Sequence, residues 1–212
     1  MTQNSKALNR LLCKNQSLLF LIFLVLNCPI SSFGQEDANG KSSIRTGLGL
    51  GINEGKREIG FGLLYSIGWQ KSIGEKNRLR LNPNIVYGGF RPVIITDTRD
   101  QYYKASSLGF NVHYDLIEFE RASIVTSLGG FVNYSRGLLG TGGMDEEAST
   151  GSDYFHALYF GGSASVGVRI ESKNRKMAYE IRPYNFQYGT EGFVMSYFMF
   201  GMDIKLNSST KN

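Results

Sequence analysis

Over most of the chain, apolar and polar side chains alternate with a period of two residues. In one run, for example, Ile59, Phe61 and Leu63 lie on one face, and Gly60 and Gly62 lie on the other. Strict alternation is typical of strands with one apolar and one polar face, and helical spacing fits none of the runs. Eight such runs follow one another, at residues 44–53, 58–70, 78–88, 108–116, 122–135, 158–171, 176–184 and 197–206. We therefore expect an all-β fold of eight strands.

The connections between these runs alternate in length. Tight, charged turns are expected at residues 74–77, 118–120 and 172–175, and long connections at residues 90–102 and 136–153. If the chain begins on the periplasmic side, every tight turn falls on that side and both long loops fall on the other. Short periplasmic turns, longer outer loops and an even number of strands are typical of outer-membrane barrels.

The composition of the polar faces indicates which face points inward. Glycine recurs on these faces, and a narrow lumen of about eight strands requires small side chains. The apolar faces carry no Asp, Glu, Lys or Arg, as expected of a wall that faces lipid. Four apolar exceptions lie on the polar faces: Leu64, Val86, Val125 and Phe131. A soluble lipocalin-like barrel, with the apolar faces inside, is the alternative.

The N-terminus has the features of a secretory signal. Lys6, Arg10 and Lys14 precede an apolar run at residues 18–26, and Ser32-Phe33-Gly34 supplies small residues for cleavage. The apolar run is shorter than the roughly 20 residues that span a bilayer. We expect a cleaved signal peptide at 1–34 and export through the Sec pathway; an uncleaved anchor helix, or a lipoprotein modified at Cys28, are the alternatives.

Removal of this segment changes the chemistry of the mature chain. Both cysteines, Cys13 and Cys28, lie within it, so no disulfide, thiol nucleophile or cysteine metal site is expected. The mature chain keeps 20 basic against 18 acidic residues, a net charge of +2, which gives no argument for nucleic acid. A polar linker at 35–42 leads into the barrel at 43–207, and a polar tail at 208–212 follows it.

The junction Ser32-Phe33-Gly34-Gln35 and the closing strand at 200–206 carry a resemblance to a known class. The chain resembles small outer-membrane β-barrel proteins of the OmpA/OmpX-like type and, in style, the porin-like barrel proteins of Bacteroidota. The resemblance is one of pattern over residues 43–207. It implies a transmembrane up-and-down barrel in the outer membrane of a Gram-negative bacterium. Many such barrels end on an aromatic residue, and here a polar tail departs from that pattern.

The lumen-facing positions hold the most chemical-looking residues. A tight turn places Arg169 opposite Glu180, with Arg182 one pleat further along and Asp203 and Lys205 nearby. Because buried charges must be paired, we expect a structural network of ion pairs in a narrow barrel. A proton or ion path is the alternative.

Other titratable groups offer weaker candidates for chemistry. His113 and Asp115 share one face and form a possible acid–base pair, although no nucleophile is placed beside them. His156 has no second His or Cys nearby for a metal. The acidic cluster at 145–147 is a candidate for a divalent cation that bridges lipopolysaccharide, although solvated loop acids are the commoner case.

Together these observations favour a barrel that performs no catalysis and binds no cofactor. We expect a monomer in contact with outer-membrane lipid and the barrel assembly machinery, with a structural or binding role through the loops at 90–102 and 136–153. A lipid-modifying hydrolase and a soluble periplasmic carrier of an apolar ligand are the alternatives.

Overall fold

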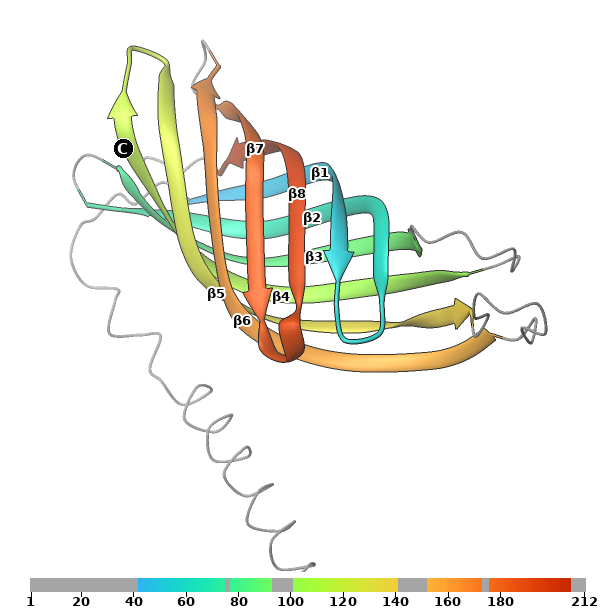
Figure 1. Cartoon of the computed structure of the whole chain (residues 1–212). Helices are drawn as coiled ribbons and strands as arrows, with labels where there is room; N and C mark the ends of the chain where they lie inside the picture. The colour runs from blue at the N-terminus through green and yellow to red at the C-terminus, as the bar shows by residue number, and fades with distance from the viewer. Residues whose placement is uncertain (1–41, 75–76, 93–100, 141–151, 173–175, 207–212) are drawn as a thin grey trace, which may run out of the picture. The chain divides into compact units, whose positions relative to one another are not determined.

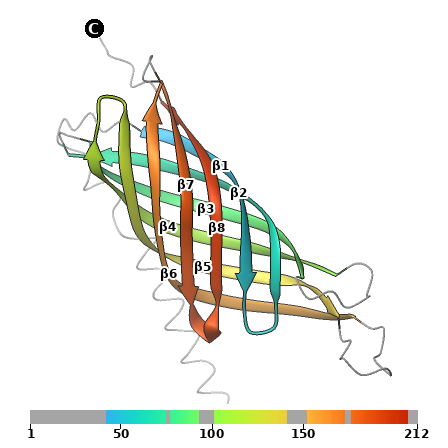
Figure 2. The ribbon, with the colours of Figure 1, turned by 45° about the horizontal axis from the view of Figure 1, so that its top comes forward.

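The chain folds into a closed antiparallel barrel. A computed structural model describes residues 42–74, 77–92, 101–140, 152–172 and 176–206. The eight strands are β1 (Ser42–Glu54), β2 (Ile59–Ile73), β3 (Leu79–Pro92), β4 (Tyr102–Glu118), β5 (Ala122–Gly140), β6 (Ser152–Glu171), β7 (Met177–Gly189) and β8 (Val194–Lys205). Each strand pairs with the next, and β1 pairs with β8 to close the barrel (Figures 1 and 2). The expected all-β, up-and-down, eight-stranded fold is confirmed.

The connections divide between the two ends of the barrel. The short-turn end carries the connections at 74–78, 119–121 and 172–176. The loop end carries those at 55–58, 93–101, 141–151 and 190–193, the last of which contains a short 3-10 helix, η2 (Thr190–Gly192). Within the described ranges, no helix is long and apolar enough to cross a membrane.

The long connections are shorter than the sequence analysis predicted. The expected loops at 90–102 and 136–153 were wrong at their edges, because β3 runs to Pro92, β5 runs to Gly140 and β6 begins at Ser152. Pairing of β5 with β6 continues to Gly140 opposite Ser152, so the ladder supplies partners for backbone groups that a loop would expose. The remainders, 93–100 and 141–151, lie outside the described residues, and the acidic cluster at 145–147 lies there too.

The predicted chain ends also lie largely outside the described residues. The signal peptide at 1–34 and the tail at 208–212 fall there entirely. Of the linker at 35–42, only Ser42 is described, and it is the first residue of β1 because it pairs with Lys71 of β2.

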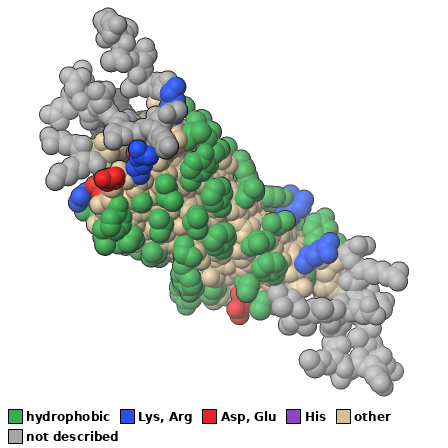
Figure 3. All heavy atoms as spheres, turned by 90° about the horizontal axis from the view of Figure 1, so that it is seen from above, with side chains coloured by type: hydrophobic (Ala, Val, Ile, Leu, Met, Phe, Trp, Pro, Cys, Tyr) green, Lys and Arg blue, Asp and Glu red, His purple; other side chains and the backbone are tan. Residues whose placement is uncertain are grey.

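The apolar faces point outward. Leu48, Leu63 and Leu128 are 65%, 69% and 67% exposed, whereas Arg45 and Asp203 are almost fully buried inside. In Figure 3 apolar side chains cover the middle of the barrel and charged side chains gather toward its ends. A soluble carrier with its apolar residues inside is therefore the wrong arrangement for this chain.

Glycines on the inner face make room for large side chains of the neighbouring strand. A Cβ atom at Gly62 would lie 2.7 Å from the Phe90 ring and 2.1 Å from the carbonyl oxygen of Gly89. A larger residue at this position therefore clashes with both the ring and the backbone of β3. The abundance of glycine on the polar faces reflects close packing inside a narrow barrel.

A bulge in β7 reverses one expected orientation. The ladder between β7 and β8 shifts register between Arg182 and Asn185, and both of these residues face inward although they are three positions apart. Two consecutive residues, Pro183 and Tyr184, therefore face outward. Strict alternation over the run at 176–184 predicts that Tyr184 shares the inner face with Arg182. This prediction was wrong, because the extra residue of a bulge moves the following side chains to the other face.

Candidate functional site: a lumen filled in two layers

The lumen is filled by two layers of side chains. The charged layer lies toward the short-turn end and comprises Arg45, Gln70, Arg80, His113, Asp115, Arg169, Glu180, Arg182 and Asp203. The aromatic layer lies toward the loop end and comprises Leu64, Val86, Phe90, Tyr103, Ala105, Phe131, Phe155, Tyr159, Phe193, Met195 and Met199. Apart from Phe193, which lies in the connection between β7 and β8, both layers consist of inward-facing residues of the strands.

Glu180 of β7 is the centre of the charged layer. Its carboxylate accepts a hydrogen bond from Arg45 Nη1 at 3.0 Å, and its other oxygen accepts one from Arg182 Nε. The register places Arg169 opposite Glu180, but the Arg169 guanidinium pairs with Asp203, at 3.3 Å. One carboxylate thus forms buried ion pairs with two arginines at once.

Asp203 extends this network across the seam where the barrel closes. Its carboxylate lies 3.6 Å from Arg45 Nη1 and accepts a hydrogen bond from Gln70 Nε2 at 3.4 Å. Arg45 and Gln70 lie at polar positions of the alternating runs at 44–53 and 58–70, which by themselves indicate no role for either residue. Arg45 is the register partner of Asp203. The pairing of β1 with β8 therefore brings Arg45 into the network of ion pairs.

Lys205 lies at the rim of the barrel, outside the charged layer. Its Nζ atom lies 2.7 Å from Glu171, whose carboxylate also lies 3.7 Å from Arg169. A chain of opposite charges therefore runs from the rim at Lys205 to Asp203 inside.

His113 and Asp115 are both buried, but they bind different partners. The Asp115 carboxylate forms an ion pair with Arg80 and accepts a hydrogen bond from Ser123 Oγ. His113 Nδ1 lies 3.1 Å from Arg182 Nη2. Since a guanidinium only donates hydrogen bonds, this ring nitrogen is the acceptor and its lone pair is engaged. This geometry favours a structural role for His113.

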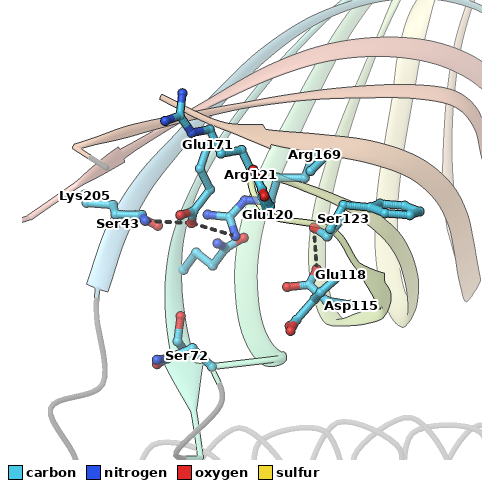
Figure 4. Close-up of a pocket in the computed structure, with 14 residues that line it drawn as sticks. Ser43, Ser72, Asp115, Glu118, Glu120, Arg121, Ser123, Arg169, Glu171 and Lys205 are labelled. Carbon is cyan, nitrogen blue, oxygen red and sulfur yellow. Dashed lines mark hydrogen bonds and ion pairs between the residues drawn. The ribbon is translucent and has the colours of Figure 1, made fainter. Parts of the chain in front are cut away.

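The short-turn end opens into a cavity of about 240 Å³. Figure 4 shows Lys205, Glu171 and Arg169 on one side of it and Ser123 with Asp115 on the other. Its wall carries both signs of charge, and its inner boundary is the charged layer. Among the described residues, no group of three or more His, Cys, Asp or Glu side chains is placed to hold a metal ion.

Stacked rings hold the aromatic layer together. Phe90 stacks on Tyr103 with ring centroids 5.2 Å apart, and Tyr103 meets Phe155 edge-on at 5.8 Å. Phe193, from the connection between β7 and β8, folds inward and stacks on Tyr159 at 4.7 Å. Leu64, Val86 and Phe131, the apolar exceptions on the polar faces, all lie in this layer.

Glu58 lies at the loop end of the aromatic layer, in the connection between β1 and β2. Its side chain is buried, and its carboxylate accepts a hydrogen bond from the Tyr159 hydroxyl at 3.0 Å. Burial raises the pKa of Glu58 above its ordinary value, although the hydrogen bond from Tyr159 opposes this effect.

Comparisons with known proteins support the fold. No protein-family model and no curated protein matches the chain. Among solved structures, Neisserial surface protein A (NspA) matches 78% of this chain and 97% of its own, with a TM-score of 0.57 and 13% identity. Ail, the attachment invasion locus protein of Yersinia pestis, matches 79% of this chain and 99% of its own, with a TM-score of 0.50 and 10% identity. The chain thus has the closed-barrel fold of outer-membrane proteins.

Proposed function

We propose that the protein is a non-conducting barrel of the bacterial outer membrane that serves as a structural or binding platform through its loop end. The observation that carries this proposal is the combination of an exposed apolar wall with a lumen filled by two successive layers. The loop end faces the cell exterior in this arrangement, and the short-turn end faces the periplasm, as is usual for such barrels.

The outer wall supports the membrane location. Exposed apolar side chains occur on every strand, and monomeric soluble proteins rarely expose contiguous apolar patches beyond a few hundred Å². Exposed aromatic residues with polar edges lie toward both ends: Trp69, Tyr114 and Tyr179 near the short-turn end, and Tyr102, Tyr134, Tyr154 and Tyr188 near the loop end. Outer-membrane barrels carry such aromatic girdles at both interfaces.

The filled lumen supports the absence of conduction. An ion entering from the short-turn end meets paired arginines and carboxylates, and one entering from the loop end meets stacked rings. Displacing either layer exposes buried charges or breaks ring packing. The described lumen therefore favours a platform over a pore.

A catalytic role finds no support in the same geometry. The imidazole of His113 faces Arg182, and Asp115 is engaged by Arg80, so neither is available to a substrate. We therefore retain the binding role, with the connections at 93–101 and 141–151 as the parts of the chain presented to an outside partner.

Extraction and conductance test this proposal together. We expect the mature protein to require detergent for extraction, to migrate faster on a denaturing gel before boiling than after, and to add no conductance to a planar bilayer. Recovery from the soluble periplasm without detergent contradicts the membrane location, and stable unitary currents contradict the closed lumen.

A single charge on the wall tests the assignment of inside and outside. We expect Leu128→Arg to destabilise the barrel by about 2–4 kcal/mol, because its side chain faces the middle of the bilayer. The matched control is Phe119→Arg, which is similarly exposed (64%) but lies in the turn between β4 and β5. Folding yield in detergent, measured by the gel shift, is expected to fall for the first variant only. Normal folding of Leu128→Arg contradicts the assignment.

A further inference from the structure

A row of basic side chains crosses the outer wall at the loop end. Lys104 of β4 is the register partner of Arg136 of β5, and Arg136 is the register partner of His156 of β6. All three side chains are exposed and point away from the lumen. On this part of the wall, basic residues thus occupy positions that are apolar further down the same strands.

Apolar and aromatic side chains border this basic row on both sides. The row nearer the loops is Tyr102, Leu138 and Tyr154, which are also register partners, and Tyr134 and Leu158 lie on the other side. A shallow cavity of about 290 Å³ lies over β4 to β6. It is lined by Tyr102, Lys104, Arg136, Gly137, Leu138 and Tyr154.

The basic row has no acidic partner among the residues that the structure describes. The ion pairs within the described ranges involve other side chains, and Lys104 Nζ instead lies 5.8 Å from the centroid of the Tyr102 ring. Within the described residues, Lys104 and Arg136 are therefore exposed cations on an otherwise apolar surface, a setting that suits an anion at the membrane surface.

We propose that the basic row binds the phosphorylated headgroup of a glycolipid in the outer leaflet, an inference that rests on the membrane location and orientation proposed above. The row lies just beyond the apolar wall at the end assigned to the exterior, where the headgroups of the outer leaflet lie. Long basic side chains place their charge at that level while their stems stay on apolar surface.

The spacing of the row favours a headgroup with more than one phosphate. Neighbouring strands are about 4.8 Å apart, so the row from Lys104 to His156 spans roughly 10 Å. A headgroup with phosphates on two linked sugars spans a comparable distance, whereas a single phosphodiester engages one of these residues at a time. Arg136 offers paired N–H donors for one phosphate, and Lys104 and His156 offer further donors. Acyl chains of the same lipid then lie against the apolar wall below.

The experiment compares lipids and variants on the folded, detergent-solubilised full-length mature protein. The probe is a diphosphorylated glucosamine disaccharide lipid, measured by native mass spectrometry against its dephosphorylated form, phosphatidylglycerol and inorganic phosphate. The test variant combines Lys104→Glu with Arg136→Glu. The control combines Arg121→Glu with Lys176→Glu, two exposed basic residues at the short-turn end.

We expect the test variant to bind the diphosphorylated lipid about tenfold more weakly than the wild type and the control. The milder pair Lys104→Gln with Arg136→Gln, expected to weaken binding in the same direction, keeps the test valid if the charge reversal prevents folding. Equal binding by the test variants and the wild type overturns the proposal, as does equal affinity for the dephosphorylated lipid, phosphatidylglycerol or free phosphate. The gel shift of the wild type separates these outcomes from failure of the membrane assignment itself.

Discussion

The two layers of the lumen arise from the same alternating pattern and are stabilised in opposite ways. The charged layer depends on directed contacts, such as Arg45 with Glu180 at 3.0 Å, and fails if one partner is removed. The aromatic layer depends on packing, such as that of Phe193 on Tyr159, and is destabilised when loss of a ring leaves a cavity. At a given position along its axis, a narrow barrel can thus be filled by either ion-paired or aromatic side chains, provided that no space is left on the inner face.

The charged layer is expected to be the more sensitive of the two to a single atom change. Glu180→Gln keeps the shape of the side chain but leaves Arg45 and Arg182 without their shared carboxylate. We expect a loss of about 3–5 kcal/mol, because an uncompensated buried charge is costly. Urea-dependent unfolding in detergent micelles, followed by the gel shift, measures this loss.

A surface pair provides the matched control for this prediction. Glu118→Gln removes the partner of Arg78 in a pair that is more than one-third exposed, and we expect a much smaller change in stability than for Glu180→Gln. If Glu180→Gln costs no more than Glu118→Gln, the charged layer does not stabilise the fold and the contrast between the layers fails.

The aromatic layer is expected to lose stability without opening a pore. Phe90→Ala removes a ring that stacks on Tyr103 and leaves a cavity, at a cost of about 3 kcal/mol. Planar-bilayer conductance is expected to stay at the baseline, because the charged layer still fills the lumen below. Phe61→Ala, which truncates an exposed ring on the outer wall and leaves no internal cavity, is the control and is expected to cost less. Currents through Phe90→Ala would show that the charged layer alone does not close the barrel.

The sequence predicted well which face of each strand points inward. It predicted poorly where each inward side chain lies along the barrel axis. Alternation identified which side chains point inward because a strand has a strict period of two. Alternation did not show that Leu64, Val86 and Phe131 lie together in the aromatic layer. The position of a side chain along the barrel axis depends on the stagger between neighbouring strands. The pairings of β1 with β8 and of β8 with β7 set that stagger for Arg45 and Glu180, which are 135 positions apart in the chain.

The bulge in β7 is the second feature that the alternating pattern did not predict. The bulge at Pro183 and Tyr184 shifts the register by one residue, and a period-two pattern alone assigns Tyr184 to the wrong face. The proline is the one local signal, since it lacks the N–H that a regular ladder position uses. For the candidate site, the inward positions of Arg182 and Asp203 followed from the pattern, whereas the partners of His113 required the closed barrel.

Glu58 offers the test with the smallest expected effect, since this titratable side chain contacts the aromatic layer. Because burial raises the pKa of this carboxyl, the folded chain keeps a proton at pH values where the unfolded chain has lost it. Stability is therefore expected to fall as the pH rises from about 4.5 through the raised pKa.

Glu58→Gln removes this dependence and keeps an amide oxygen that accepts the hydrogen bond from Tyr159. We expect the variant to be more stable than the wild type at pH 7.5 and equal to it at pH 4. Glu191→Gln, which alters an exposed pair with Lys56 at the same end, should show no such trend with pH. A Glu58→Gln variant that is less stable than the wild type at pH 7.5 would mean that the carboxylate is held charged, and that the aromatic layer tolerates a buried charge as the charged layer does.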